Sequence, residues 1–377
     1  MDLKPFKKPI YITRPILPNL QAMQDKLKQI WITKWLSNNG YQHRLFEREI
    51  QKVLKVPCVS LFNNGTIALL TAVRALNLSG EVITTPFTFP ATPHVLSWNN
   101  IQPVFCDIDP VSLTIDANKI EKQINKKTTA ILAVHVFGNP CNIYKIQKIA
   151  SRYNLKVIYD AAHAFEVELN GIGIGNFGDL TMFSFHPTKL FHTAEGAALT
   201  GKKHELKKKV DLLKNFGIKN EEEVVEIGIN GKMNEIQAAL GLLVLKIKNK
   251  ERMKRKLLCA TYRNCLINTE GISILGEESN IKNSYQYLVI RIDQKKFGRS
   301  RNFIYSKLKE YNIFTRKYFY PLCSNFPYYK NHKSSGSKNL PEATKAVEEV
   351  LSMPFYGELK VVDIEKICTI LKNLKTK

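Results

Sequence analysis

The sequence predicts an α/β fold, with a large domain built on a mostly parallel sheet and a smaller C-terminal α+β domain. Three observations support this fold class. Short β-branched runs alternate with helical stretches from about residue 58 to residue 185. A long helical stretch follows, and a shorter set of strand and helix patterns comes after it. Ligands of such sheets bind beyond the carboxyl ends of the strands, so polar residues that follow strands are the candidates for chemistry.

The alternating series begins with a strand at residues 59–62 and a helix at residues 65–76. The remaining strands are expected at residues 81–85, 102–107, 130–134 and 156–160, and the remaining helices around residues 95–98, 116–124 and 143–153. Short runs of β-branched residues favour strands, whereas longer runs with apolar residues three or four positions apart favour helices. Because a helical stretch separates each strand from the next, we expect parallel strands with helices on both faces.

Two domains are predicted, comprising residues 1–250, with an N-terminal segment, and residues 251–377. A long helix through residues 234–265 leads from the first domain into the second. In the second domain we expect a strand at residues 285–290, a helix near residues 303–311 and a C-terminal helix after Val362. Residues 326–339 are the most loop-like stretch.

The composition restricts the classes of function. The 377 residues carry a net charge of +23, from 56 Lys and Arg against 33 Asp and Glu. The lysines are scattered along helices without interleaved aromatic residues, so we expect no nucleic-acid partner, and the charge favours an anionic substrate. No apolar run approaches the ~20 residues that span a membrane, and the first residues lack the apolar core of a signal peptide. The seven dispersed cysteines indicate free thiols in the cytoplasm and no metal site.

The functional interpretation depends on Lys189. It follows a predicted strand and has apolar neighbours such as Phe185 and Phe191, although most lysines are solvated surface charges. Burial lowers the pKa of a lysine and makes its amine available as a nucleophile and a base. Asp160 ends an earlier strand, and His163 follows three residues later. An amine for an aldehyde and a carboxylate for a protonated ring nitrogen suit pyridoxal 5'-phosphate, so we predict this cofactor.

Four further residues are candidates for holding the cofactor. Gly65 and Thr66 lie between a strand and a helix, where backbone N–H groups and the helix dipole favour a phosphate. Ser184 supplies a hydroxyl close to the lysine, and Phe89, just past another strand, is suited to stack on a flat ring. Each residue alone has an ordinary alternative, either a helix cap or core packing. Their combination with Lys189 favours a cofactor site.

Six segments in order resemble the DegT/StrS-type nucleotide-sugar aminotransferases, a fold-type I pyridoxal-phosphate family. The resemblance extends over nearly the whole chain. The segments are residues 35–40 (Trp-Leu-Ser-Asn-Asn-Gly), 63–69 (Asn-Asn-Gly-Thr-Ile-Ala-Leu), 84–89 (Thr-Thr-Pro-Phe-Thr-Phe), 160–165 (Asp-Ala-Ala-His-Ala-Phe), 183–189 (Phe-Ser-Phe-His-Pro-Thr-Lys) and 230–241 (Asn-Gly-Lys-Met-Asn-Glu-Ile-Gln-Ala-Ala-Leu-Gly). One such segment is a weak signal, whereas six in order are highly specific.

The resemblance implies a role for each cofactor-binding candidate. Lys189 would form the Schiff base with the cofactor, Asp160 would pair with the pyridine nitrogen, and His163 would approach the phenolic oxygen. Gly65, Thr66 and Ser184 would hold the phosphate. Phe89 would stack on the ring. These roles are expectations from the family.

The resemblance also implies a homodimer and a substrate site. Asn230 matches a family position that reaches the cofactor phosphate of the neighbouring subunit, so the active sites would be shared. The candidates for substrate binding are Asn39, His186, Arg316, Lys317, Tyr318 and Tyr320. The basic residues among them could bind a nucleotide diphosphate by charge-assisted hydrogen bonds, although a partly exposed strand or loop is the ordinary alternative.

The chain departs from common family spellings at three positions. Lys232 stands where Arg is frequent, Ala197 where Gly is usual and Glu166 where Gly often follows Phe. Lys232 keeps the charge but loses the bidentate geometry of Arg. The other two departures bear on local backbone shape and leave the amine chemistry unaffected.

The reaction implied is amino transfer from L-glutamate to a dTDP-linked 4-keto-6-deoxyhexose. The product would be dTDP-4-amino-4,6-dideoxyglucose, for O-antigen or another surface polysaccharide. The alternatives are a 3-keto sugar or galacto-epimer aminotransferase and, from another class, a non-catalytic pyridoxal-phosphate-binding regulator. The sequence leaves open the sugar epimer, the keto position and the choice between dTDP and UDP.

Overall fold

The computed structural model describes residues 4–276 and 279–376. Its α-helices are α1 (Leu20–Thr33), α2 (Tyr41–Leu54), α3 (Gly65–Ala75), α4 (Ala91–Trp98), α5 (Ile143–Tyr153), α6 (His204–Leu213), α7 (Glu235–Leu266), α8 (Gln294–Phe297), α9 (Arg301–Glu310), α10 (Pro341–Glu349) and α11 (Val361–Asn373). Its strands are β1 (Cys58–Phe62), β2 (Glu81–Thr84), β3 (Gln102–Phe105), β4 (Thr128–Val134), β5 (Lys156–Asp160), β6 (Glu168–Leu169), β7 (Ile172–Gly173), β8 (Leu180–Ser184), β9 (Ala197–Gly201), β10 (Ile272–Ile274), β11 (Ile281–Lys282), β12 (Leu288–Ile292) and β13 (Val350–Met353).

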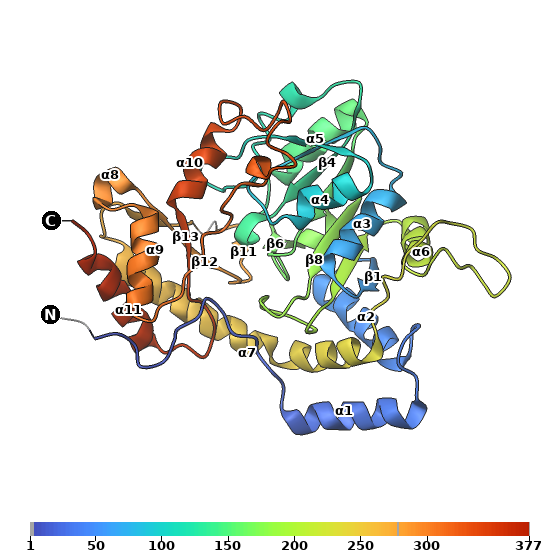
Figure 1. Ribbon diagram of the computed structural model, residues 1–377. Coiled ribbons are helices and arrows are strands. Elements are labelled where there is room, and N and C mark those ends of the chain that lie inside the picture. The colour runs from blue at the N-terminus through green and yellow to red at the C-terminus, as the bar shows by residue number, and fades with distance from the viewer. Residues whose placement is uncertain (1–3, 277–278, 377) are drawn as a thin grey trace.

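A seven-stranded sheet forms the centre of the larger part of the molecule (Figure 1), in the order β1-β9-β8-β5-β4-β2-β3. The pairs from β8 through β5, β4 and β2 to β3 are parallel, whereas β9 is antiparallel to both of its neighbours. The predicted α/β fold with a mostly parallel sheet is therefore confirmed. Because parallel strands end at the same edge, the residues that follow β5 and β8 come together there.

Helices cover both faces of this sheet. On one face, α3 and α4 pack through a core that includes Leu69 and Leu96. On the other face, α2, α5 and α7 contribute Phe46, Ile146 and Leu242 to a second core. Buried strands with apolar side chains on both faces are typical of a parallel sheet between two helical layers. In the part of the chain that the structure describes, each helix is too short or too polar to span a membrane.

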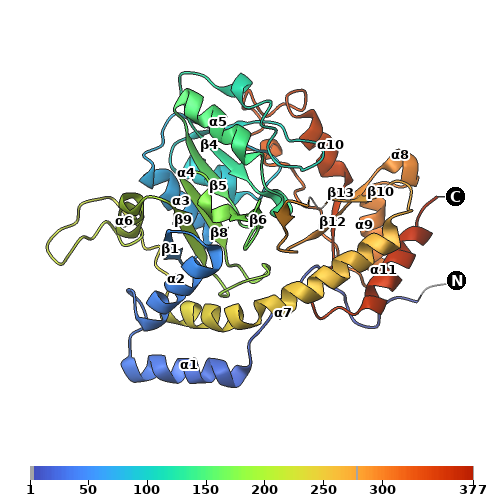
Figure 2. The same ribbon diagram turned by 180° about the vertical axis from the view of Figure 1, so that it is seen from behind.

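The C-terminal elements build a smaller sheet, β10-β12-β13, which packs with α9, α11 and the end of α7 around its own core. Helix α7 begins with a capping box between Asn234 and Gln237 and continues past residue 250, from the large sheet to the C-terminal elements (Figures 1 and 2). Near the N-terminus, Ile10 forms a β-bridge with Ile313. The division at residue 250 stays a prediction, and α7 crosses it.

Two expected elements differ from the structure. The helix predicted over residues 116–124 is wrong, because only a 3₁₀ turn at Glu121–Gln123 forms there. The Asp116 carboxylate accepts hydrogen bonds from the backbone N–H and the side chain of Asn118, and such local bonds compete with a helix. The strand expected at residues 285–290 begins three residues later, at Leu288, because the preceding segment contacts the turn that follows β8, where Gln286 donates a hydrogen bond to the Thr188 carbonyl.

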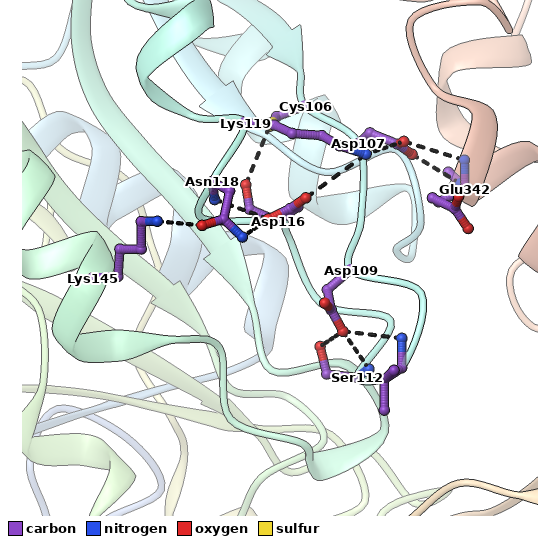
Figure 3. A network of polar contacts seen from close by, with 11 residues as sticks. Cys106, Asp107, Asp109, Ser112, Asp116, Asn118, Lys119, Lys145 and Glu342 are labelled. Carbon is purple, nitrogen blue, oxygen red and sulfur yellow. Dashed lines mark hydrogen bonds and ion pairs between the residues drawn. The ribbon is translucent and has the colours of Figure 1, made fainter.

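A buried carboxylate joins the end of β3 to the start of α10 (Figure 3). The Asp107 side chain has no exposed surface, and it accepts hydrogen bonds from the N–H groups of Glu342 at 3.2 Å and Ala343 at 2.9 Å. The Lys119 ammonium donates a third bond at 2.8 Å. Since a buried charge is stable only when it is paired and hydrogen-bonded, this contact ties α10 to the large sheet.

Replacing Asp107 with Ala should lower the free energy of unfolding by about 2–4 kcal/mol, because the N–H groups of Glu342 and Ala343 lose their acceptor and Lys119 loses the nearer of its two carboxylate partners. Chemical denaturation measures this change. Asp109→Ala is the matched control, since the hydrogen bonds that the Asp109 carboxylate accepts come from Val111 and Ser112 of its own loop. Its expected loss is about 1 kcal/mol. Equal losses in the two variants would contradict the importance of the link to α10.

Candidate active site

A cavity of about 840 Å³ lies beyond the ends of β5 and β8. The beginning of α3 and residues from the C-terminal part of the chain complete its walls. Most of the predicted site residues line this cavity: Gly65, Thr66, Phe89, Asp160, His163, Ser184, His186, Lys189, Arg316 and Tyr318. Residues that are far apart in the sequence, such as Gly65, Lys189 and Tyr318, therefore share one space.

Lys189 is partly buried at the base of a turn that follows β8. Its Nζ donates a hydrogen bond to the Tyr287 hydroxyl at 3.2 Å. Burial lowers the pKa of Lys189 to about 8, while Tyr318 and the Asp160 carboxylate act in the opposite direction. An amine with this pKa is neutral in a larger fraction of molecules near neutral pH than an ordinary lysine, so it is a better nucleophile.

The Asp160 carboxylate is 5% exposed and held in one orientation by two neutral donors. Its Oδ2 accepts a hydrogen bond from the Thr92 hydroxyl at 2.9 Å, and its Oδ1 accepts one from the Ala162 N–H at 3.0 Å. Burial raises the pKa of Asp160, while these hydrogen bonds and the charge of Lys189 act in the opposite direction. A cation that entered the cavity would stabilise the ionised carboxylate.

His163 is a buried, neutral imidazole. Its Nδ1 accepts a hydrogen bond from the Phe137 N–H at 3.2 Å, so the ring hydrogen lies on Nε2. Burial, helped by the charge of Lys189, lowers the pKa of His163 well below its usual value. The ring is parallel to that of Phe319, with centroids 5.7 Å apart, and meets the Tyr287 ring edge to face at 4.8 Å. These contacts fix the imidazole plane and leave it a hydrogen-bond donor.

The N-terminus of α3 opens into the same cavity. The Asn64 side chain caps the helix by accepting a hydrogen bond from the Ile67 N–H at 2.9 Å. Gly65 and Thr66 carry the first two amides of the helix, and such amides have no intrahelical acceptor. A Cβ at Gly65 would lie 3.5 Å from the Ser184 Cβ, so the serine lies close to the helix start. Free amides beside a hydroxyl are suited to bind a phosphate.

The substrate-side candidates fall into two groups. Arg316 and Tyr318 line the cavity, and the guanidinium lies over the tyrosine ring at 4.9 Å. Burial raises the pKa of Tyr318 to about 12, so its hydroxyl stays protonated. His186 also faces the cavity, where its Nδ1 is 2.8 Å from the Thr188 hydroxyl. Phe89 lines the cavity with 53% of its surface exposed, which leaves its ring available for stacking.

The remaining candidates lie outside the lining of this cavity. Lys317 donates to the Asn302 side chain at 3.2 Å, and its ammonium lies over the Tyr320 ring at 4.9 Å. Asn39 and Asn230 are exposed. Their roles stay predictions, since the expected function of Asn230 belongs to a neighbouring subunit.

Several contacts in the site were not expected from the sequence. Tyr287 bonds the Lys189 amine, Thr92 bonds the Asp160 carboxylate, and Gln286 bonds the backbone next to the lysine. A Tyr-Gln-Tyr run directly before an apolar strand was the only local signal for two of these residues. Among the described residues, no group of three or more His, Cys, Asp or Glu side chains is placed to hold a metal ion.

Residues 20–372 match the DegT/DnrJ/EryC1/StrS aminotransferase family. The chain belongs to this family. It is 44% identical to the dTDP-4-amino-4,6-dideoxy-D-glucose transaminase of Escherichia coli, covering 97% of this chain and 98% of that protein. The transaminase of the same name from Shigella dysenteriae is 43% identical, covering 98% and 100% of the two chains. The predicted family and the predicted enzyme class, an aminotransferase, are confirmed.

Solved structures agree with this assignment. DesI, determined in the presence of its TDP-sugar product, has a TM-score of 0.94 with this chain at 30% identity, covering 98% of this chain and 94% of DesI. Helicobacter pylori PseC, an aminotransferase involved in the biosynthesis of pseudoaminic acid, has a TM-score of 0.90 at 28% identity, covering 98% and 99% of the two chains. The predicted fold-type I aminotransferase architecture is confirmed by this similarity.

The low pKa of Lys189 gives a measurable reactivity profile in cofactor-free protein. Only the neutral amine reacts with an acylating reagent, so labelling of Lys189 should rise with pH and reach half of its maximum at about pH 8. Competitive labelling followed by peptide mass spectrometry measures this midpoint. In urea-unfolded protein, the midpoint should rise toward ~10.4, the value of an ordinary lysine. The same midpoint in folded and unfolded protein would show that burial does not shift this pKa.

Proposed function

We propose that this chain binds pyridoxal 5'-phosphate and transfers an amino group from L-glutamate to a dTDP-linked 4-keto-6-deoxyhexose. The product is dTDP-4-amino-4,6-dideoxyglucose, a precursor for O-antigen or another surface polysaccharide. One observation carries the proposal: the Lys189 amine, the Asp160 carboxylate and the start of α3 face a single cavity of about 840 Å³. The two relatives at 43–44% identity, both named as transaminases of this amino sugar, support the choice of product.

The residues of the cavity fit the cofactor. Asp160 is a buried carboxylate whose two hydrogen-bond donors are neutral, so it suits a protonated ring nitrogen. The amides of Gly65 and Thr66 suit the phosphate, and the close approach of Ser184 adds a hydroxyl. Bound pyridoxal phosphate would supply an aldehyde for the amino group and a ring that withdraws electrons.

The side chains of the chain supply the remaining catalytic functions. Lys189 acts as the base that takes a proton at its neutral Nζ and returns it, which its pKa of about 8 permits. Asp160 would keep the ring nitrogen of the cofactor protonated by opposing its charge, and the Nε2–H of His163 would be available as a donor to the phenolic oxygen. The Tyr287 hydroxyl, 3.2 Å from Nζ, orients the amine. The buried aromatic rings around His163 exclude water from this side of the cavity.

The nucleotide sugar enters on the side of the cavity that Arg316 and Tyr318 line. A guanidinium binds phosphate oxygens with charge-assisted hydrogen bonds, and the net charge of +23 attracts an anionic substrate. Lys317, which contacts Asn302 and Tyr320, lies outside the lining of this cavity. The geometry therefore supports Arg316 as the main contact of the diphosphate.

The same proposal includes a homodimer with shared active sites in the cytoplasm. Residues 216–230 carry several exposed apolar side chains, among them Phe216, Val224 and Ile227, in the loop that projects beyond α6 (Figure 1). Large exposed apolar areas are typical of surfaces that another chain covers. Asn230 ends this loop, which is consistent with a contact to the site of a second subunit.

Purified protein incubated with dTDP-4-keto-6-deoxyglucose, L-glutamate and pyridoxal phosphate should form a 4-amino sugar of the gluco configuration. Nuclear magnetic resonance of the product determines the position and the configuration of the amine. A 3-amino product would show that the substrate is a 3-keto sugar. A 4-amino product of the galacto configuration would show that the enzyme forms the galacto epimer. If glutamate fails to convert the bound cofactor to its amine form, the non-catalytic alternative is correct.

Arg316→Ala should raise the KM for the nucleotide sugar by about 10- to 100-fold, because a charge-assisted hydrogen bond contributes about 1.5–3 kcal/mol. Lys317→Ala is the adjacent control and should change KM by less than about twofold, because Lys317 lies outside the lining of the cavity. Steady-state kinetics at saturating glutamate measure both values. A larger effect at Lys317 than at Arg316 would contradict the proposed diphosphate contact.

A further inference from the structure

A short segment, residues 283–287, connects helix α7 to the turn that carries Lys189. On one side, the Arg252 guanidinium donates to the Asn283 carbonyl at 3.2 Å, and that of Arg255 donates to the Gln286 carbonyl at 3.4 Å. Arg255 is itself held by an ion pair of 2.7 Å with the buried Glu251. The segment therefore has a fixed position relative to α7.

On the other side, the Gln286 side chain contacts the backbone directly before and after Lys189. Its Oε1 accepts a hydrogen bond from the Leu190 N–H at 2.5 Å, and its Nε2 donates one to the Thr188 carbonyl at 3.1 Å. The two partners are a donor and an acceptor, so they determine the orientation of the amide. The side chain is 4% exposed and Leu190 is fully buried, so water cannot readily replace the bond to its N–H.

We propose that Gln286 is a positioning residue, whose amide holds the backbone on both sides of Lys189 and thereby fixes the place of the lysine amine. This inference rests on the proposed function of Lys189. The role of Gln286 cannot be predicted from its neighbours in the sequence, because the two partners of its amide lie 96 and 98 positions away.

The contacts around the lysine support this role. The Lys189 N–H donates to the His186 carbonyl at 2.9 Å, so three consecutive residues of the turn have fixed backbone bonds. The next residue after Gln286 is Tyr287, whose hydroxyl bonds the Lys189 Nζ at 3.2 Å. Two adjacent residues thus hold the backbone and the amine of the same lysine.

Loss of the amide should loosen the turn and let water reach the amine. Without Gln286, the buried Leu190 N–H loses its acceptor, and a buried N–H without a partner favours conformations that expose it. A more hydrated amine is more easily protonated, so the pKa of Lys189 should move upward toward that of an ordinary lysine. Proton transfer by Lys189 would slow, whereas binding of the sugar at Arg316, on a different segment, would change little.

The test compares Gln286→Met, which keeps the approximate volume and removes both hydrogen bonds, with wild-type protein. Gln42→Met is the matched control, because Gln42 is also buried and its amide makes two hydrogen bonds, to Lys26 at 3.0 Å and Gln29 at 3.2 Å. The first measurement is the pH midpoint of Lys189 labelling in cofactor-free protein. We expect an upward shift of about half a unit to one unit in Gln286→Met and none in Gln42→Met.

The second measurement is steady-state kinetics of the loaded enzymes. Gln286→Met should lower kcat by about tenfold or more with little change in the KM for the nucleotide sugar, because Lys189 acts in proton transfer. Gln286→Asn, one methylene shorter, keeps a polar side chain and serves if the Met variant fails to fold. Its amide cannot reach both partners without movement of the backbone, so a shift of the midpoint in the same direction is expected.

Two results would overturn the inference. One is a labelling midpoint and a kcat equal to those of wild-type protein in a folded Gln286 variant. The other is an equal change in Gln42→Met, which would indicate a general loss of stability. The proposed function fails separately: in that case, wild-type protein incubated with pyridoxal phosphate has the same visible absorption spectrum as Lys189→Ala, whatever the labelling of Gln286 variants shows.

Discussion

Asp160 ends β5 and Lys189 follows the neighbouring parallel strand β8, so the buried carboxylate and the partly buried amine line one cavity. Burial disfavours the charged form of each group, so it lowers the pKa of the amine and raises that of the carboxylate. Both shifts make the site responsive to a ligand, because a cation near Asp160 stabilises the ionised carboxylate and the neutral Lys189 amine reacts with an electrophile. The start of α3 and the aromatic walls of the cavity contribute to the proposed catalysis only because they surround this pair.

The C-terminal part of the chain contributes residues to the lining of the site. Tyr287, which precedes α9 in the sequence, and Arg316, which follows it, both line the cavity. Gln286 bonds the backbone of the turn that carries Lys189. Asp107 makes a comparable connection at another place, where it ties α10 to the end of β3. The two parts of the molecule therefore share buried polar contacts, which fix the distance between the amine and the substrate-side residues. We infer that catalysis depends on this fixed distance as much as on the residues themselves.

The sequence predicts the parts of the site that local patterns encode. Asp160 and Lys189 could be found because each follows an apolar strand, and Gly65 because a glycine starts a helix after a strand. Gln286 and Thr92 could not be found in this way, since their partners lie 98 and 68 positions away in the sequence. The helix expected over residues 116–124 was wrong for a related reason: side-chain bonds to the backbone outweighed the apolar pattern.

Covalent trapping tests the central claim most directly. Protein loaded with pyridoxal phosphate is reduced with borohydride, digested and mapped by mass spectrometry. The account predicts that the reduced cofactor is attached to the peptide that contains Lys189, and that Asp160→Asn weakens cofactor retention without moving the attachment. A fully loaded protein in which this peptide is unmodified, or in which another lysine carries the cofactor, would contradict it.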